Sequence, residues 1–325
     1  MARLAVLGAN SFAGSGLVDE SLRRGYEVLG ISRSPEAPEL FHAPRPAGYR
    51  FLRADLNQDQ EAIQRSLDEF APEEIVDLAG QGMVAESWSR PEQWYRTNLV
   101  AKVVLHEFLR TRPWLRRYVR VSTPEVYGST PEPVTEERPY APSTPYAVSH
   151  AAADMSLLAY QRHYGFPVVV GRFANFFGPG QQLYRIVPRT ILAALTGRKL
   201  PLHGGGTSVR AFVHVRDVAA GILAALERGQ PGEVYHFSPD EFHTIRQVVE
   251  TVCEELGVPF EQVAEVAPER PGKDHAYLMN SDKARAALGW APSISFREGI
   301  RETIRWVREH LDAMRALPWE YEHKP

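Results

Sequence analysis

The stretch Arg3-Leu-Ala-Val-Leu7, followed by the turn Gly8-Ala-Asn-Ser-Phe-Ala-Gly14, decides the fold of this chain. The first five residues form a short apolar run typical of a buried parallel strand. The residues after the turn have the apolar spacing of a helix, which Gly25 ends. A strand, a glycine-rich turn and a helix in this order predict a site for the pyrophosphate of a dinucleotide. Free N–H groups at the helix start would face the phosphates, although the middle position of the turn holds serine where glycine is usual.

Strands and helices alternate through the first half of the chain. Further strands are expected at residues 27–31, 49–52, 75–78, 118–122 and 168–171, and long helices at 59–70, 91–112 and 146–164. This alternation predicts an α/β fold with a Rossmann-type doubly wound parallel sheet.

Beyond Phe173, loops rich in Gly and Pro alternate with short helices, which predicts a smaller α/β C-terminal domain for the substrate. We expect residues 1–172 and 209–238 to form the dinucleotide-binding domain and residues 173–208 and 239–325 to form the substrate domain. Further helices are expected at 188–196, 217–228, 244–256 and 296–317, and Asp217 is interpreted as an N-cap.

Composition excludes several classes of function. The 325 residues are 44% apolar and 24% charged, as in an ordinary globular protein, and the net charge of −3 gives no basic surface for nucleic acid or an anionic membrane. A single cysteine, Cys253, excludes an intrachain disulfide and fits a reducing compartment. No apolar run reaches the ~20 residues of a membrane span, so a cytoplasmic protein is expected. The histidines lie at no spacing typical of metal ligands, and no metal site is predicted.

The end of the second predicted strand, Gly30-Ile-Ser-Arg-Ser34, discriminates between the two nicotinamide dinucleotides. An acid there would bind the ribose hydroxyls of NAD, whereas a basic residue accommodates the 2′-phosphate of NADP. The tract has no carboxylate and places Arg33 between Ser32 and Ser34. Because an arginine–phosphate contact is strong and geometrically specific, NADP is predicted as the cofactor, with NAD as the second choice.

Further motifs follow in one order along nearly the whole chain. They are Asp55-Leu56, Leu78-Ala-Gly80, Ser122-Thr-Pro-Glu-Val-Tyr-Gly128, Pro145-Tyr-Ala-Val-Ser-His150, Arg172-Phe-Ala-Asn-Phe-Phe-Gly-Pro179, Arg210, Arg270-Pro-Gly272 and Leu288-Gly-Trp290. In order and spacing the chain resembles the extended short-chain dehydrogenase/reductases that modify nucleotide sugars, the NAD-dependent epimerase/dehydratase family. Its motifs are most similar to those of the GDP-mannose 4,6-dehydratases and the GDP-4-keto-6-deoxymannose reductases.

The resemblance implies a set of binding residues. Those for the cofactor are Gly8, Ser11, Phe12, Gly14, Ser32, Arg33, Asp55, Leu56, Leu78, Ala79, Gly80, Tyr146 and His150. Those for a nucleotide-diphosphate sugar are Thr123, Asn175, Arg185, Val187, Arg210 and Arg270. Several convergent arginines suit a dianionic diphosphate. Family members commonly form a homodimer through a four-helix bundle, for which the helices from about Pro91 and Tyr146 are the matching ones here.

The resemblance also implies a chemistry, carried by Thr123, Glu125, Tyr146 and His150. Tyr146, aided by the Thr123 hydroxyl, takes the proton of the sugar C4 hydroxyl while hydride leaves C4. The resulting ketone acidifies C5–H, so Glu125 can eliminate water across C5–C6 before hydride returns to C6. This describes a nucleotide-sugar 4,6-dehydratase, a lyase, and the tract Ser32-Arg33 favours the GDP-mannose type.

The chain departs from the family pattern at two of these positions. Pro124 stands where many dehydratases carry an aspartate that protonates the leaving hydroxyl, so Glu125 would have to do both tasks. His150 stands where the family has a lysine whose charge lowers the pKa of the tyrosine. Because histidine is mostly neutral at pH 7, an alkaline optimum and a gain in rate for His150→Lys are expected.

Three other functions remain open at this point. They are an NADPH-dependent reductase of 4-keto-6-deoxy sugars, a 4-epimerase, and a catalytically impaired binder of cofactor or sugar nucleotide. The binder is favoured by Ser11, Pro124 and His150 occurring together. Stoichiometry separates the functions, because a dehydratase releases water without net consumption of cofactor and a reductase consumes NADPH.

Overall fold

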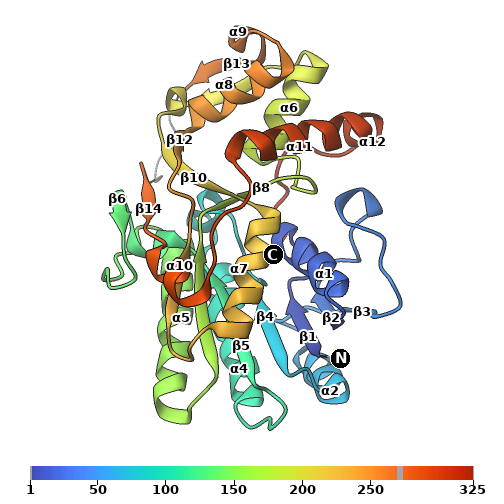
Figure 1. Cartoon of the computed structure of the whole chain (residues 1–325), viewed down its shortest axis with the longest axis vertical. Coiled ribbons are helices and arrows are strands. Elements are labelled where there is room, and N and C mark those ends of the chain that lie inside the picture. Colours follow the sequence, from blue (N-terminus) through green and yellow to red (C-terminus); the bar gives the residue numbers. More distant parts are fainter. Residues whose placement is uncertain (1, 269–273, 325) are drawn as a thin grey trace.

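The computed structural model of the chain describes residues 2–268 and 274–324. A seven-stranded sheet with helices on both faces forms one part, and a smaller part built mainly from helices lies over one end of the sheet (Figure 1). The predicted α/β fold with a doubly wound parallel sheet is therefore confirmed. None of the helices within the described residues has the length and apolar character to cross a membrane.

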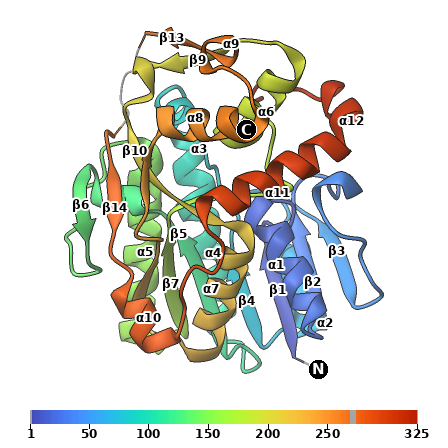
Figure 2. The same ribbon diagram turned by 45° about the horizontal axis from the view of Figure 1, so that its top comes forward.

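The sheet has the strand order β11-β7-β5-β4-β1-β2-β3, and every neighbouring pair is parallel. Figure 2 shows β7, β4, β1, β2 and β3 in this sequence beneath the smaller part. The strands are β1 (Arg3–Leu7), β2 (Glu27–Ser32), β3 (Tyr49–Arg53), β4 (Glu74–Asp77), β5 (Arg117–Ser122), β7 (Val168–Phe173) and β11 (Val234–Phe237). The six strands expected from the sequence are present, and β11 is an addition.

Strand β1 is apolar at every position after Arg3 because helices cover both faces of the sheet. Leu4 and Val6 pack on one side, and Ala5 and Leu7 on the other. The first side is covered by α1 (Phe12–Arg23) and α7 (Val215–Arg228), and the second by α2 (Gln60–Phe70), α4 (Ala101–Leu109) and α5 (Pro145–Tyr164).

The helix expected at 91–112 is divided into three pieces. An α-helix, α3 (Pro91–Tyr95), runs into a π-helical turn, Arg96–Val100, before α4 begins. The turn presents the buried Asn98, whose side chain bonds the backbone N–H and carbonyl of Gln81 and the hydroxyl of Ser149. Such turns are frequent at functional sites, and side-chain periodicity does not reveal them.

The smaller part has its own core, which includes Val187, Ile191, Val248 and Ile300. Its helices are α6 (Ile186–Thr196), α8 (Ile245–Leu256), α9 (Phe260–Val263), α11 (Phe296–Glu309) and α12 (Leu311–Arg315). A three-stranded sheet of β8 (Asn175–Phe177), β10 (Val209–His214) and β12 (Phe242–Thr244), and the pair β9 (Leu200–His203) and β13 (Ala264–Ala267), belong to the same region. A further pair joins β6 (Thr130–Val134) to β14 (Tyr277–Met279).

Two elements cross the domain limits expected from the sequence. β10 pairs with β8 and β12 and takes no place in the seven-stranded sheet. Helix α10 (Asp282–Leu288) packs on the large sheet, because Ala284 and Leu288 belong to the same core as β1. The chain thus crosses between the two parts more often than loop composition suggests.

Asp217 holds the connection between α10 and α11 against α7. The N-cap of α7 is His214, so the N-cap interpretation of Asp217 is wrong. The buried Asp217 carboxylate accepts hydrogen bonds from the backbone N–H groups of Ser293 and Ile294 and from the Ser293 hydroxyl, at 3.0, 3.1 and 2.6 Å. Its backbone carbonyl accepts from the indole of Trp290.

We expect Asp217→Ala to lower the free energy of unfolding by ~3 kcal/mol, since it leaves buried donors without an acceptor of a charge-assisted bond. The matched control is Asp282→Ala, which removes an exposed carboxylate from the first turn of α10 and should cost less than ~1 kcal/mol. Urea unfolding monitored by circular dichroism measures both. Equal losses in the two variants would contradict this role for Asp217.

Candidate active site

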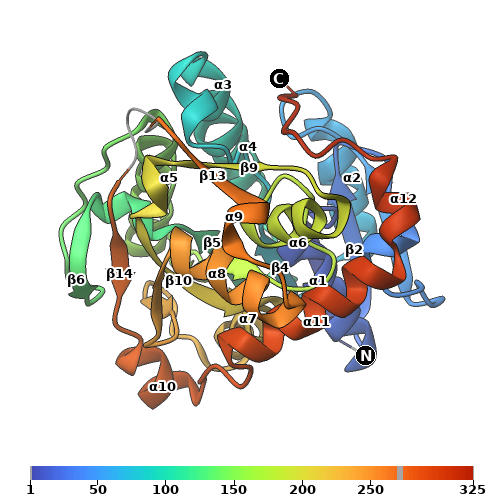
Figure 3. The ribbon, with the colours of Figure 1, turned by 90° about the horizontal axis from the view of Figure 1, so that it is seen from above.

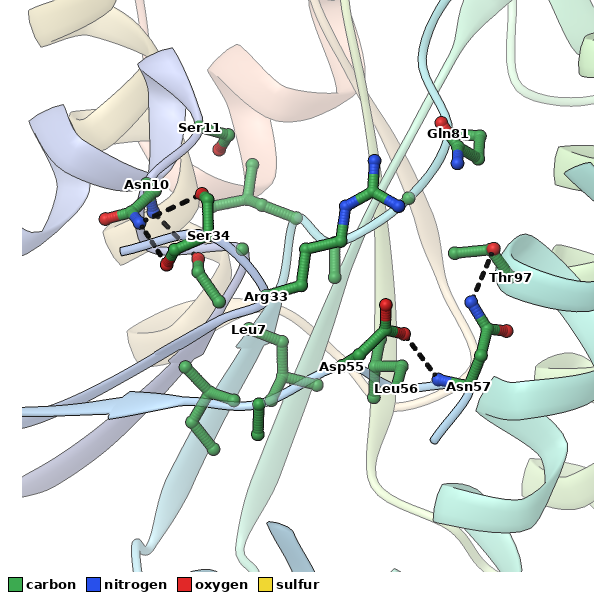
Figure 4. Close-up of a pocket in the computed structure, with 17 residues that line it drawn as sticks. Leu7, Asn10, Ser11, Arg33, Ser34, Asp55, Leu56, Asn57, Gln81 and Thr97 are labelled. Atoms are coloured by element: carbon green, nitrogen blue, oxygen red, sulfur yellow. Dashed lines mark hydrogen bonds between the residues drawn. The ribbon is translucent and has the colours of Figure 1, made fainter. Parts of the chain in front are cut away.

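A pocket lies at the carboxyl ends of β1 to β4, where the strand order reverses direction (Figure 4). This is the position at which doubly wound sheets bind dinucleotides. Most of the residues expected to bind the cofactor line it: Gly8, Ser11, Ser32, Arg33, Asp55, Leu56, Leu78, Ala79 and Gly80.

Glycine is required twice in the turn after β1. Gly8 has a φ of 84°, and a Cβ there would lie 2.7 Å from the backbone nitrogen of Ala79. A Cβ on Gly14 would lie 2.2 Å from the carbonyl oxygen of Gly8. Both positions bring backbone against backbone, which only glycine permits without a shift of the chain.

The start of α1 offers free donors toward the pocket. Ser11 is the N-cap, and its hydroxyl accepts from the N–H of Gly14 at 3.0 Å. Among the described residues, nothing accepts from the backbone N–H groups of Phe12 and Ala13. The start of α1 therefore keeps two donors for a pyrophosphate even though serine replaces the middle glycine.

Arg33 reaches across the pocket from the end of β2, with Ser11 on one side and Gln81 on the other (Figure 4). Its guanidinium donates to the backbone carbonyl of Lys324 at 2.8 Å, and the Gln81 amide donates to the same oxygen at 2.9 Å. The segment after α12 runs back past α3 (Figure 3), where the ring of His323 stacks on Trp94. Arg33 thus already contacts a backbone carbonyl at the rim of the pocket.

The four candidate catalytic residues come from two neighbouring elements. Thr123 follows β5 and caps a short 3-10 helix, Pro124–Tyr127, which carries the buried Glu125. Tyr146 and His150 lie in the first two turns of α5, and their rings are 4.6 Å apart between centroids. The two elements bring Thr123 and Glu125 close enough to Tyr146 to shift the pKa of its phenol.

Burial sets the pKa of Glu125. It raises the pKa to about 7, against a lowering by the positive charge of Arg210 and a further raising by Asp274. A carboxyl group that titrates near neutrality can both take and return a proton under working conditions.

Burial moves Tyr146 and His150 away from their charged forms as well. The pKa of the Tyr146 phenol is raised above its usual value by burial and by the nearby Glu125, and the Thr123 hydroxyl lowers it in part. The pKa of His150 is held well below its usual value by burial and by the charges of Arg120 and Lys102. His150 is therefore neutral in this site and brings no charge of its own to the phenol.

The residues expected to bind substrate lie in several places. Arg210 is buried, donates to the carbonyls of Val209, Asp274 and His275, and stacks on Tyr277 with 4.0 Å between its Cζ and the ring centroid. The Tyr277 hydroxyl donates to Asn175 at 3.0 Å. Tyr277 is thus a site residue that the sequence analysis missed, because β14 joins the site only through its pairing with β6 and an isolated bridge from its neighbour Ala276 to Val209.

The other substrate candidates differ in what they offer. Arg185 is exposed and lies near enough to Glu125 and Tyr146 to lower their pKa values. Val187 has a fully buried side chain in the core of the smaller part, so only its backbone could face a ligand. Arg270 lies outside the described residues.

A cluster of buried charges lies directly behind His150, and the sequence analysis did not find it. Its members are at most 1% exposed and are Asp77, Lys102, Arg120, Asp154 and Arg172. A signal was available, since Arg120 stands between two valines of β5 and Arg172 is the only polar residue of β7, and a charge is expected inside a buried strand only if it is paired.

The chain is similar to known proteins over most of its length. Residues 5–303 match the family described as GDP-mannose 4,6 dehydratase. A dTDP-glucose 4,6-dehydratase of Streptomyces niveus is 34% identical over 318 aligned positions, which cover 95% of this chain and 93% of that protein.

Solved structures show the same similarity. DesIV, a dTDP-glucose 4,6-dehydratase of Streptomyces venezuelae solved with NAD and TYD bound, has a TM-score of 0.89 and 31% identity, covering 96% of this chain and 98% of that one. The UDP-glucose 4-epimerase of Thermus thermophilus in complex with NAD has a TM-score of 0.87 and 32% identity, covering 94% and 99%. The resemblance inferred from the motifs is confirmed: the chain belongs to the NAD-dependent epimerase/dehydratase family of extended short-chain dehydrogenase/reductases, the enzymes that modify nucleotide sugars.

Proposed function

We propose that the protein is a nucleotide-sugar 4,6-dehydratase that uses a nicotinamide dinucleotide. The observation that carries the proposal is Glu125, a buried carboxyl group with a pKa raised to about 7 beside Tyr146 and within reach of the charges of Arg210 and Arg185. An epimerase or a reductase needs no second base at this place, whereas a dehydratase needs one to remove the C5 proton.

The pocket fits a dinucleotide. Gly8 and Gly14 allow the backbone segments around the turn to lie close together. The N–H groups of Phe12 and Ala13 at the start of α1 would hold the pyrophosphate. When bound, the nicotinamide would accept hydride from the sugar C4 and return it to C6. We propose Tyr146 and His150 as the contacts at the nicotinamide end of the cleft, beyond the part of the pocket that Gly8 to Gly80 line.

Tyr146 would act as the base for the C4 hydroxyl. The Thr123 hydroxyl, which lowers the pKa of the phenol, would also hold the sugar oxygen in line. Once C4 is a ketone, its neighbour C5–H is acidic enough for a carboxylate to remove.

Glu125 would then take the C5 proton and give it to the departing C6 hydroxyl, which leaves as water. Pro124 has no proton to give, so the same carboxyl group performs both transfers. A pKa near 7 suits both transfers. At neutral pH the protonated and the ionised forms of Glu125 then have similar free energies, so the group can take up a proton and release it again. As hydride returns to C6, C5 would regain a proton, and the Tyr146 phenol, protonated in the first step, would supply it and return to its starting state.

Segments 173–208 and 239–325, together with Arg210, would bind the nucleotide sugar. Arg210 is fixed by three backbone carbonyls and by Tyr277, so its guanidinium is rigidly placed near Glu125. Arg185, at the start of α6, adds a second positive charge on the same side. Two arginines suit the diphosphate of the substrate.

The nucleotide and the form of the dinucleotide are finer points of the proposal. The family description names GDP-mannose, whereas the Streptomyces relatives are named dTDP-glucose 4,6-dehydratases, so the GDP-mannose type stays a prediction. For the cofactor we now favour NAD over NADP. The related structures were solved with NAD, and Arg33, the basis of the NADP prediction, already donates to Lys324.

A panel of GDP-, dTDP-, UDP- and CDP-hexoses tests the proposal. We expect one of them to lose the mass of water, detected by mass spectrometry, with no net change in nicotinamide absorbance. The dinucleotide released by denaturing the same sample should be NAD. Consumption of reduced cofactor would instead indicate a reductase, a product of unchanged mass a 4-epimerase, and no reaction a binding protein.

Glu125→Gln should separate oxidation from elimination. We expect the rate of water loss to fall by ~10²–10⁴-fold while substrate-dependent reduction of the nicotinamide is kept, because Tyr146 and Thr123 are unchanged. In the parent protein, water loss should decline as the pH falls through about 7, since protonated Glu125 cannot act as the base. The exposed Glu132→Gln is the control and should leave both rates unaltered. Equal loss of oxidation and elimination in Glu125→Gln would exclude Glu125 as the elimination base.

We also propose a homodimer through α4 and α5, the two helices expected to form the four-helix bundle. Four large apolar side chains of this region have 38–59% of their surface exposed. They are Val148 and Met155 on α5, Val104 on α4 and Val100 at the end of the π-helical turn before α4. Val148 and Met155 also line a groove with Tyr140 and Pro142. In a twofold-symmetric dimer, the α4 and α5 faces of a second copy would cover these side chains.

Val104→Glu combined with Met155→Glu should shift the molar mass in solution from a dimer to a monomer, measured by light scattering after size-exclusion chromatography. A charge facing its own symmetry mate across an apolar contact is strongly unfavourable. Val266→Glu, at a more exposed valine of β13, should leave the mass unchanged. A monomeric parent protein would rule out the dimer.

A further inference from the structure

His150 is held from behind by an arginine on the central sheet. The Nη2 atom of Arg120 lies 3.0 Å from Nδ1 of His150, and both side chains are buried. A guanidinium has only donors, so Nδ1 must be the acceptor in this contact and carries no proton. The neutral ring then has its proton on Nε2, from which no side chain in the described part of the chain accepts a hydrogen bond.

Arg120 belongs to the buried charge cluster defined above. Asp77 accepts from Lys102 at 2.7 and 2.9 Å and from Nη1 of Arg120 at 3.3 Å. Asp154 accepts from Ser122 at 2.7 Å and from Arg172 at 3.2 Å. Three cations therefore share two carboxylates, and the cluster carries an excess positive charge next to α5.

The position of Arg120 favours His150 over its second carboxylate. Its Nε atom lies 3.8 Å from Oδ1 of Asp154, and neither atom has a hydrogen-bond partner among the residues that the structure describes. A guanidinium placed only to neutralise Asp154 would close this gap, because bidentate pairing is the stronger arrangement. Arg120 therefore makes a hydrogen bond to His150 at 3.0 Å but none to Asp154.

The charge of Arg120 also reaches the phenol. His150 packs against Tyr146 with 4.6 Å between ring centroids, and ionised Tyr146 interacts favourably with Arg120. Because Arg120 and His150 are buried, such a charge acts more strongly than it would in water.

We propose that Arg120 is a positioning residue of the reaction: it holds His150 as the Nε2–H tautomer, with that proton available to a bound dinucleotide, and brings beside Tyr146 the positive charge that a lysine at position 150 would carry. This rests on the proposed function, in which Tyr146 takes the C4 proton. It also changes the expectation for His150→Lys, because an ammonium there would meet the Arg120 guanidinium. A gain in rate is now expected only when Arg120 is replaced as well.

The tautomer can be measured without substrate or activity. Two-bond proton–nitrogen correlation spectra of the ¹⁵N-histidine-labelled protein distinguish the two neutral forms of a ring, and His150→Asn identifies its signals. We expect the Nε2–H form in the parent protein and in Arg120→Lys, which keeps a charged donor. Arg120→Met should lose this preference, whereas Arg172→Met removes an equally buried cation that does not touch His150 and should keep it.

The kinetic arm uses the sugar nucleotide found by the panel. Arg120→Met should lower kcat by ~10–100-fold with KM within about threefold, because the change affects proton removal and leaves substrate contacts intact. Arg120→Lys should recover most of kcat, and Arg172→Met should lower stability without this effect on kcat. In the His150→Lys background, Arg120→Met should no longer reduce kcat, since the two cations replace each other.

The tautomer spectra and the kcat values each test the proposed role of Arg120. An Nδ1–H or charged His150 in the parent protein overturns the proposal, and so does a kcat of Arg120→Met equal to that of Arg172→Met. If Arg120→Met fails to fold, the parent tautomer and the Arg120→Lys spectrum still give the answer. A parent protein with the Nε2–H tautomer but no reaction on any sugar nucleotide would refute the proposed function, leaving Arg120 as the residue that fixes His150.

Discussion

The parallel alignment of seven strands around β1 is the constraint on which the rest of this structure depends. Because every strand of the sheet points the same way, the turn after β1, the serine and arginine after β2, the aspartate after β3 and the motif after β4 all meet at one edge. The same alignment places Thr123 and Glu125, which follow β5, beside the start of α5. The residues proposed for the cofactor and for catalysis therefore lie at one edge of the sheet although they are far apart in the sequence.

Burial has opposite chemical consequences for the two bases at this edge. It raises the pKa of Glu125 into the range where a carboxyl group exchanges protons easily, but it raises the pKa of Tyr146 away from that range. In the proposed reaction the first effect would assist elimination and the second would oppose oxidation. A buried positive charge nearby would lower the pKa of the Tyr146 phenol. The cluster that contains Arg120 lies on the side of His150 that faces the sheet.

The cluster also has a cost for folding. Charges that are 0–1% exposed are stable only when paired, so Asp77, Lys102 and Arg120 depend on one another. Burial and the neighbouring Arg120 lower the pKa of Lys102 to about 8. Replacing a buried ion pair by well-packed apolar residues is often neutral or stabilising, so the cluster is weak evidence for stability.

The sequence by itself determined the parallel sheet and the glycine-rich turn, because apolar periodicity and turn chemistry are local properties. The resemblance to a family, and not the local pattern, named Thr123, Glu125, Tyr146 and His150 as catalytic candidates. Only the tertiary structure showed the π-helical turn at Asn98, the true role of Asp217, the placing of Tyr277 and the contact of Arg120 with His150. Each of these depends on which side chains meet across strands and helices distant in the sequence. The sequence names the groups that are present, whereas their pKa values follow from burial and from charges that only the folded chain brings together.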